Sequence, residues 1–181
     1  PVDHIPTMAF TRFLSGPMDY TPGVFNLFTK SGPDGNNRVR STIGQQLGLY
    51  VVVPSPIQMA CDLPEHYEAH LDWFQFIKDV AVDWERSITL AGEVGQYVAW
   101  ARQEKGTDDW YVGAANAEGA RNLSFDLDFL EEGKEYEATI YRDGDDADWD
   151  TNPYSVTIET MTVIRKDRMD FKLASGGGLG I

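Results

Sequence analysis

The spacing of apolar residues changes once along this chain of 181 residues, and the change limits the folds open to it. Up to about Trp84, apolar residues recur every three to four positions, as in amphipathic helices. Beyond it they alternate with polar residues, as Leu123 and Phe125 do, which is typical of half-buried strands. The sequence therefore predicts a helix-containing first part, residues 1–84, followed by an all-β second part, residues 85–181.

The first part contains two well-patterned helical stretches. One is predicted over residues 39–53, where Gly44 and Gly48 lie four apart and permit close approach of a neighbouring backbone. The other begins after Asp62, because "DLPE" has the spacing of a capping box with Glu65. Both helices are expected to bury one apolar face.

Two short segments, "PMDY" (17–20) and "IQMAC" (57–61), are expected to be strands that precede these helices. Alternating strands and helices are typical of parallel α/β structure. Two strands alone do not make a stable sheet, so the first part is interpreted as the last βα units of a (β/α)8 barrel. The chain begins at Pro1 without a methionine and stops at "GGGLGI", a turn with a strand barely begun, so we expect it to be part of a longer protein.

The second part is predicted to be an antiparallel β-sandwich. Turn sequences such as "EEGK" and "RDGDD" separate about six or seven short strands, the spacing typical of sandwiches. The boundary between the two parts is placed near Glu85 to Glu93. The predicted fold class is thus α+β in two parts, with strands expected at 96–102, 109–116, 123–129, 136–140, 154–158 and 169–173.

The charge balance argues against two classes of partner. The net charge is −14 and the isoelectric point about 4.4, so phosphate backbones repel the chain and nucleic-acid binding is disfavoured. Anionic lipid is disfavoured for the same reason, and no apolar run approaches the ~18 residues of a membrane helix.

Two stretches invite a test for metal binding. His66 and His70 are spaced i to i+4, but Tyr67 stands where the zincin motif has its glutamate, and buried, hydrogen-bonded histidines are the favoured interpretation. In the acidic loop "DGDDADWD", counting from Asp146, Thr151 takes the sixth position, where a calcium loop needs glycine. A solvated hairpin loop is therefore expected there, with a looser calcium site as the open alternative.

Several stretches resemble the C-terminal part of glycoside hydrolase family 97, the α-glucosidase and α-galactosidase family of glycan-degrading bacteria. They run in family order through nearly the whole chain: "FTRFLSGPMDYTPGVF", "RSTIGQQLGLYVVVPSPIQMACDLPEHY", "FQFIKDVAVDW", "DDWYVG" and "DADW". The resemblance implies a full enzyme with a β-sandwich, a (β/α)8 barrel and a C-terminal β-domain, acting on α-glucosidic or α-galactosidic bonds in oligosaccharides.

The resemblance also implies calcium in the active site of the α-glucosidase-type members and a periplasmic or cell-envelope location. It places the calcium-binding and acid/base glutamates on barrel segments before Pro1, so no catalytic or metal-binding residue is assigned in this chain, and the chain alone is expected to be inactive. Inverting and retaining members differ in the spacing of two carboxylates that it does not hold, so mechanism and sugar stay open.

The implied partners are an oligosaccharide substrate and the upstream barrel and N-terminal domain of the same enzyme, with a homodimer as an open alternative. Within this chain Asp19 is the candidate substrate-binding residue. The functional face of a barrel lies where strands lead into helices, and Asp19 is expected to end a strand before the loop 21–37. Its carboxylate either bonds a sugar hydroxyl or only closes a turn. Asp62, at the end of the next strand, is expected to cap a helix.

A second function remains open, a non-catalytic carbohydrate-binding or oligomerisation module built on the β-sandwich. Aromatic side chains in a flat exposed row would favour sugar binding, whereas aromatic residues in a sheet are more often core. The core interpretation is favoured for the five that bear on this choice: Trp100, Trp110, Tyr111, Trp149 and Tyr154.

Overall fold

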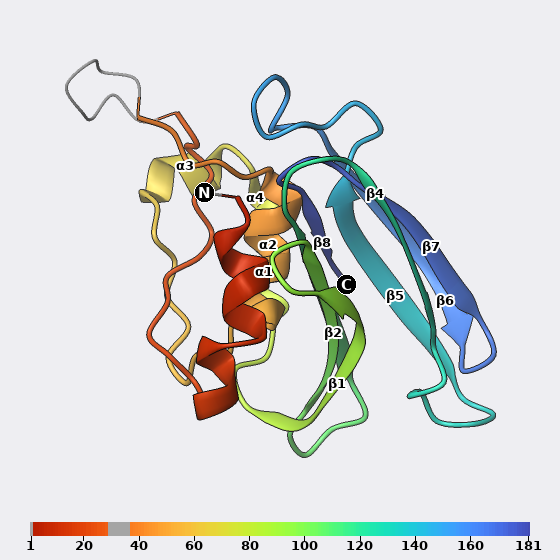
Figure 1. Ribbon diagram of the computed structural model, residues 1–181. Coiled ribbons are helices and arrows are strands. Elements are labelled where there is room, and N and C mark those ends of the chain that lie inside the picture. The colour runs from red at the N-terminus through yellow and green to blue at the C-terminus, as the bar shows by residue number, and fades with distance from the viewer. Residues whose placement is uncertain (1, 29–36) are drawn as a thin grey trace.

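The computed structural model describes residues 2–28 and 37–181. It has three layers, with helices covering one face of a six-stranded sheet and a two-stranded sheet packed on the other (Figure 1). The sandwich-like arrangement predicted for the second part is confirmed. Residues 29–36, inside the predicted loop 21–37, lie outside the described residues.

The helical elements all precede the strands. The helices are α1 (His4–Ala9), the 3-10 helix η1 (Arg12–Ser15), α2 (Ile43–Val52), α3 (Pro64–Glu68) and α4 (Leu71–Asp79). The strands are β1 (Trp84–Glu93), β2 (Tyr97–Glu104), β3 (Trp110–Asn116), β4 (Arg121–Asp126), β5 (Glu135–Asp143), β6 (Val156–Ile164), β7 (Arg168–Leu173) and β8 (Gly178–Gly180). Among the described residues, no helix has the length and apolar character needed to cross a bilayer.

Every strand pairing is antiparallel. The large sheet has the order β1-β2-β3-β8-β5-β6, and β4 pairs with β7 in the small one. The short strand β8 lies between β3 and β5, where Leu179 pairs with Ala114 on one side and with Arg142 on the other. The last strand of the chain therefore joins two halves of the sheet that are far apart in sequence.

The sandwich core follows the alternation seen in the sequence. On β7, Met169, Phe171 and Leu173 are buried while the residues between them are exposed. These side chains pack against small residues of the large sheet, among them Ala99 and Ala114, which are fully buried. Small residues on the central strands leave room for large side chains on the facing sheet.

Helix α2 is buried along its whole length and lies on the opposite face of the large sheet. A Cβ atom on Gly48 would lie 2.3 Å from the carbonyl oxygen of Leu179 and 2.8 Å from that of Ala114. Likewise, a Cβ on Gly113 would lie 2.5 Å from the carbonyl oxygen of Gly48. The predicted close approach of backbones at Gly48 is confirmed.

The two strands expected at 17–20 and 57–61 do not form, and among residues 2–28 and 37–83 the structure has no strand. A strand requires a ladder of bonds to a neighbour. Here only scattered bonds are present, such as Met18 N donating to Pro54 O and Cys61 N donating to Pro22 O. The interpretation of these segments as the end of a barrel is thus not established by the fold.

Residues 85–93, which the sequence predicts to be the boundary between the two parts, belong to strand β1. Its pairing with β2 has register shifts between Trp84 and Arg86 and between Thr89 and Ala91. Each shift moves the following side chains to the other face, so the apolar alternation that marks a strand is broken. That residues 1–84 and 85–181 form separate domains stays a prediction.

Candidate functional site

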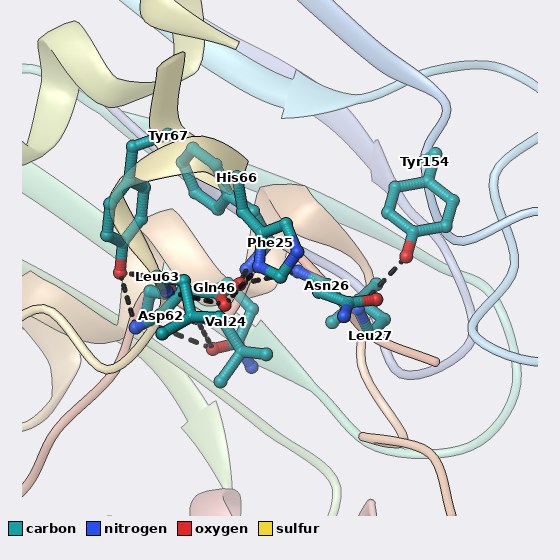
Figure 2. A network of polar contacts seen from close by, with 11 residues as sticks. Val24, Phe25, Asn26, Leu27, Gln46, Asp62, Leu63, His66, Tyr67 and Tyr154 are labelled. Carbon is teal, nitrogen blue, oxygen red and sulfur yellow. Dashed lines mark hydrogen bonds and ion pairs between the residues drawn. The ribbon is translucent and has the colours of Figure 1, made fainter. Parts of the chain in front are cut away.

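A buried carboxylate organises the region after the segment that contains Asp19. The side chain of Asp62 is 9% exposed, and its Oδ2 accepts hydrogen bonds from Phe25 N (2.7 Å) and Asn26 N (2.6 Å) (Figure 2). Its Oδ1 accepts one from Leu63 N (2.8 Å) and lies 2.5 Å from Nδ1 of His66. Asp62 therefore holds two segments together that are about forty residues apart in sequence.

These contacts set the charge state of Asp62. Burial raises its pKa, but the hydrogen bonds from Asn26, His66, Leu63 and Phe25 together outweigh burial and lower the pKa below its ordinary value. The side chain is thus a carboxylate at neutral pH, and its bonds are directed inward.

The capping role expected for Asp62 is wrong. The N-cap residue of α3 is Leu63, no side chain caps the helix, and Pro64 occupies its first turn. Proline has no N–H, so one of the orphan donors that a cap satisfies is absent. The partners of Asp62 that the sequence did not reveal, Phe25 and Asn26, lie too far away along the chain for any local pattern to show them.

Further side chains fix residues 21–28, which we call the anchored loop. Oε1 of Gln46, on α2, accepts bonds from Gly23 N and Val24 N, both at 3.2 Å (Figure 2). The hydroxyl of Tyr67, on α3, donates to Gly23 O (2.8 Å). Side chains from helices α2 and α3 therefore hold the beginning of the loop by hydrogen bonds.

The two ends of the anchored loop are held as well. Tyr154, just before β6, accepts a bond from Leu27 N (2.9 Å), which ties the loop to the β-sheet region (Figure 2). The hydroxyl of Tyr50 lies 3.1 Å from Pro22 O and 3.0 Å from Met59 O. The anchored loop therefore has a defined shape despite the absence of secondary structure.

Asp19 lies just before the anchored loop and is exposed. Its neighbours Met18 and Tyr20 pack against the cluster around Leu49, and Met18 N donates to Pro54 O (3.0 Å). Within residues 2–28 and 37–181, no hydrogen bond or ion pair engages the Asp19 carboxylate. Its position leaves the carboxylate accessible, and its role in substrate binding stays a prediction.

The two histidines are not on one continuous helix. The chain leaves helical structure after α3 and resumes it in α4 at Leu71, so the i to i+4 geometry of a zinc pair is lost. The side chain of His66 is about one-third exposed rather than buried, but it is hydrogen-bonded as expected. The ring of His70 stacks on that of Trp73, with 3.7 Å between the ring centroids. Across the part of the chain that the structure describes, no group of three or more His, Cys, Asp or Glu side chains is placed to hold a metal ion.

The acidic loop before β6 uses its carboxylates to fold itself. Oδ1 of Asp148 accepts bonds from Asp150 N (2.8 Å) and Thr151 N (3.0 Å). Asp146 accepts bonds from Ser155 (2.5 Å) and Asn152 (2.9 Å). The loop is built as a turn in which aspartate side chains bond nearby backbone and side-chain donors, in agreement with the expected hairpin loop.

The tryptophan of the "DADW" motif connects this loop to the first part of the chain. The guanidinium groups of Arg38 and Arg40 lie over the ring of Trp149, at 5.1 and 5.4 Å from its centroid. Arg38 also forms an ion pair with Asp150 (2.6 Å). Cation–π contacts and this ion pair therefore join residues 38–40 to the acidic loop.

The aromatic residues of the sheet do not form an exposed row. Trp100 packs edge-on to Phe13 on the helical face of the large sheet. Trp110 packs against Phe129 on the opposite, sandwich face, with 4.8 Å between the ring centroids. The structure therefore favours packing roles over a flat sugar-stacking surface for these two residues.

The comparison with known families decides the assignment. A family model described as "Glycosyl-hydrolase 97 C-terminal, oligomerisation" matches residues 83–181. The chain belongs to glycosyl-hydrolase family 97. The resemblance drawn from the sequence motifs is confirmed.

Two curated relatives agree with the family assignment. The chain is 36% identical over 175 residues to a retaining alpha-galactosidase of Bacteroides thetaiotaomicron, covering 95% of this chain and 26% of the relative. It is 34% identical over 124 residues to a probable retaining alpha-galactosidase of Streptomyces bingchenggensis, covering 68% of this chain and 18% of that protein. The chain thus spans about a quarter or less of these family 97 relatives.

Solved structures match the fold throughout. A Glycoside Hydrolase Family 97 enzyme from Pseudoalteromonas sp. strain K8, solved in complex with panose and with acarbose, superimposes with a TM-score of 0.95 and 49% identity. The match covers 99% of this chain and 28% of that enzyme. A beta-arabinopyranosidase with 22% identity and a TM-score of 0.76 shares the fold.

Proposed function

We propose that this chain forms the C-terminal part of a family 97 enzyme that hydrolyses α-galactosidic or α-glucosidic bonds in oligosaccharides. The match over 99% of the chain to a family 97 enzyme, at a TM-score of 0.95, carries the proposal. Because the chain spans only 28% of that enzyme, the acids that perform the hydrolysis are assigned to the remainder of the protein.

The first part of the chain is proposed to complete the catalytic barrel. The extended segments around residues 17–22 and 57–61 meet where Cys61 N donates to Pro22 O, and each precedes a helical region. In the whole enzyme, neighbouring barrel strands would supply the ladder that these segments lack here. The anchored loop would then lie on the face of the barrel where sugars bind, and Asp62 would act as its internal support.

The second part is proposed to stabilise the barrel and to serve association between copies of the enzyme, in line with the family description. A homodimer is the simplest closed assembly. The alternative, a carbohydrate-binding module, is less supported, because Trp100 and Trp110 lie on opposite faces of the sheet.

Calcium in the full enzyme and a periplasmic or cell-envelope location are also proposed, on the family resemblance alone. The described residues offer no cluster of side chains for the metal, so this chain contributes no ligand that we assign. Its own contribution is to shape and support the site.

The test compares this chain with the full-length enzyme on an aryl α-galactoside and an aryl α-glucoside. We expect turnover by the full-length enzyme and none by the chain alone. If the purified chain alone hydrolyses either substrate, the assignment of the catalytic acids to the remainder of the enzyme is wrong. A full-length enzyme that is inactive on both classes of substrate would overturn the proposed activity.

A further inference from the structure

The two edges of the six-stranded sheet are protected to different degrees. Strand β1, at one edge, has two register shifts in its pairing and carries the charged residues Glu85, Arg86 and Glu93. Strand β6, at the other edge, pairs with β5 along all nine of its residues without a shift. Bulges and charged side chains keep a strand edge from pairing with another chain. Strand β1 therefore has this protection, and β6 lacks most of it.

The sequence of β6, "VTIETMTVI", favours pairing on its free side. It contains no lysine, proline or glycine, and β-branched residues make up most of it. Its one charged residue, Glu159, forms an ion pair with Arg142 (2.7 Å). Ile158, Met161 and Ile164 are large and apolar, yet they are 38%, 46% and 39% exposed. A regular edge with exposed apolar side chains is a surface to which another strand adds.

The backbone groups of alternate residues on β6 point away from β5. Just before β6, Gly144 N donates to Ser155 O (2.9 Å), so the backbone of Ser155 bonds on the side of β5. Along an antiparallel strand the direction of the N–H and C=O groups alternates from residue to residue. The residues of β6 whose backbone groups point outward are therefore Val156, Ile158, Thr160, Thr162 and Ile164.

The turn between β6 and β7 closes one end of this edge. Ile164 N donates to Oδ2 of Asp167 (2.8 Å), and Asp167 N donates to Ile164 O (3.0 Å). Within residues 2–28 and 37–181, no hydrogen bond engages the outward backbone groups of residues 156, 158, 160 and 162. The free edge therefore extends from residue 156 to residue 162.

We propose that β6 pairs antiparallel with the β6 strand of a second copy of the enzyme about a two-fold axis, so that two six-stranded sheets join into one. This interface rests on the association between copies proposed above and gives it a surface. The family model described as oligomerisation matches residues 83–181, which include β6. The helices and the N-terminus lie on the side of β1, β2 and β3, away from β6 (Figure 1). The barrel, proposed to include these helices, therefore leaves the free edge accessible.

Two of the symmetric registers open to β6 are unfavourable. With Glu159 on the two-fold axis, two glutamates face each other and repel. With Met161 on the axis, Ile158 has to bond the backbone of Ile164 of the partner subunit, whose groups the turn already uses. Neither register therefore satisfies both the backbone and the side chains.

The register with Thr160 on the axis avoids both conflicts. Thr160 then exchanges backbone bonds with Thr160 of the partner subunit, and Ile158 exchanges them with Thr162 of the partner subunit. All of these groups are free in the single copy. No like charges lie directly opposite each other, so this is the register we assign.

The test measures the molar mass of the full-length enzyme by sedimentation over a concentration series. Thr160→Pro removes an outward N–H that β5 does not use, whereas the matched control Thr160→Val keeps the N–H and the shape of the side chain. We expect dimers for the native enzyme and for Thr160→Val. For Thr160→Pro we expect a dimer dissociation constant raised about tenfold or more. The melting temperature should be the same in all three proteins.

A second variant covers the case in which proline unfolds the strand. Ile158→Lys leaves the backbone intact and places a charge on the free edge, where Ile158 is exposed in the single copy. It should weaken the dimer as Thr160→Pro does. If either variant is folded and dimerises with native affinity, pairing through β6 is overturned and the proposed association is left to another surface.

The same samples separate this interface from the proposed function. A native enzyme that stays monomeric throughout the series would overturn both the β6 interface and the proposed association between copies. Hydrolysis of an aryl α-galactoside or α-glucoside by the native enzyme is measured alongside, and it decides the proposed glycosidase activity independently of the molar mass.

Discussion

The buried carboxylate of Asp143, on β5, accepts a 2.6 Å hydrogen bond from the hydroxyl of Thr42, the N-cap residue of α2. Its other oxygen accepts bonds from Ala174 N (2.9 Å) and Gly178 N (2.8 Å). Asp143 is 1% exposed and lies where the helical layer meets the sheet. Burial raises its pKa to about 6, although these three hydrogen bonds act to lower it.

Asp143 makes the stability of the protein depend on pH in a defined window. Its folded pKa, about 6, is higher than the ordinary value of 3.8, so between these values the folded state binds more protons than the unfolded state. The free energy of unfolding should therefore fall as pH rises from 4 to 6, by about 3 kcal/mol from this group, and then level off.

Urea denaturation of the native chain and of the Asp143→Asn variant across pH 4–7 measures this contribution as the difference between the two curves. An NMR titration of the Asp143 carboxyl carbon in the native chain provides a readout that does not depend on the variant folding. A midpoint near or below the ordinary value of 3.8 would contradict the prediction.

The contact between α2 and the sheet should tolerate no side chain at Gly48. A methyl group there would lie 2.3 Å from a backbone carbonyl oxygen of Leu179, and backbone atoms of a central strand have no room to move. We expect Gly48→Ala to destabilise the protein by about 3 kcal/mol, measured by chemical denaturation.

Gly92→Ala is the matched control. A Cβ at Gly92 first meets the far end of the Phe10 ring, at 2.6 Å, and that half-buried side chain can rotate away. Gly92→Ala should therefore lower the free energy of unfolding by less than about 1 kcal/mol. Similar losses in the two variants would show that the close approach at Gly48 is not what limits the packing of α2.

The anchored loop should depend on the charge of Asp62. Asn at this position keeps one acceptor oxygen but points an amide donor at backbone N–H groups that now bond the carboxylate. We expect Asp62→Asn to cost about 2–4 kcal/mol of stability at pH 7, whereas Asn at the exposed Asp19 should cost almost nothing.

The pH dependence of the Asp62 contribution has the opposite sign from that of Asp143. Its folded pKa lies below its ordinary value of 3.8, so the stabilisation is present above that value and is lost as pH falls through the folded pKa. The native chain and Asp62→Asn should therefore converge in stability as the pH is lowered through the folded pKa of Asp62. A difference that stays constant throughout acidification would contradict a role for the charge.

Local sequence patterns predicted those parts of the fold whose cause is local. The alternation in β7 and the four-residue spacing of Gly44 and Gly48 led to a strand and a tightly packed helix, and both are present. Strand β1 was missed because bulges break its alternation. The sequence also predicts strands at 17–20 and 57–61, which do not form. A strand requires hydrogen-bonded neighbouring strands, and a local pattern does not show whether such neighbours are present.

The candidate site was harder to predict, for the same reason. Its organising contacts join Asp62 to Phe25 and Tyr154 to Leu27, across 37 and 127 positions of sequence. No spacing rule links such residues. The break between α3 and α4, which separates His66 from His70, depends on tertiary packing that helix propensity does not include.

The last prediction concerns Asp19 in the full-length enzyme. Met18 and Tyr20 are packed inward, Met18 N is bonded to Pro54 O, and Pro17 and Pro22 restrict the backbone on either side. A carboxylate held outward in this way is pre-positioned for a ligand. If it bonds a sugar hydroxyl, Asp19→Asn removes a charged hydrogen bond worth about 1.5–3 kcal/mol.

That loss corresponds to a fall in kcat/KM of about ten- to a hundredfold, with the melting temperature unchanged. Asp128→Asn, which alters an exposed carboxylate in the loop after β4, serves as the control and should leave both quantities as they are. Steady-state kinetics with an aryl glycoside and thermal denaturation measure the two effects separately. A folded Asp19→Asn enzyme with native kcat/KM would show that this aspartate only shapes the turn between Pro17 and Pro22.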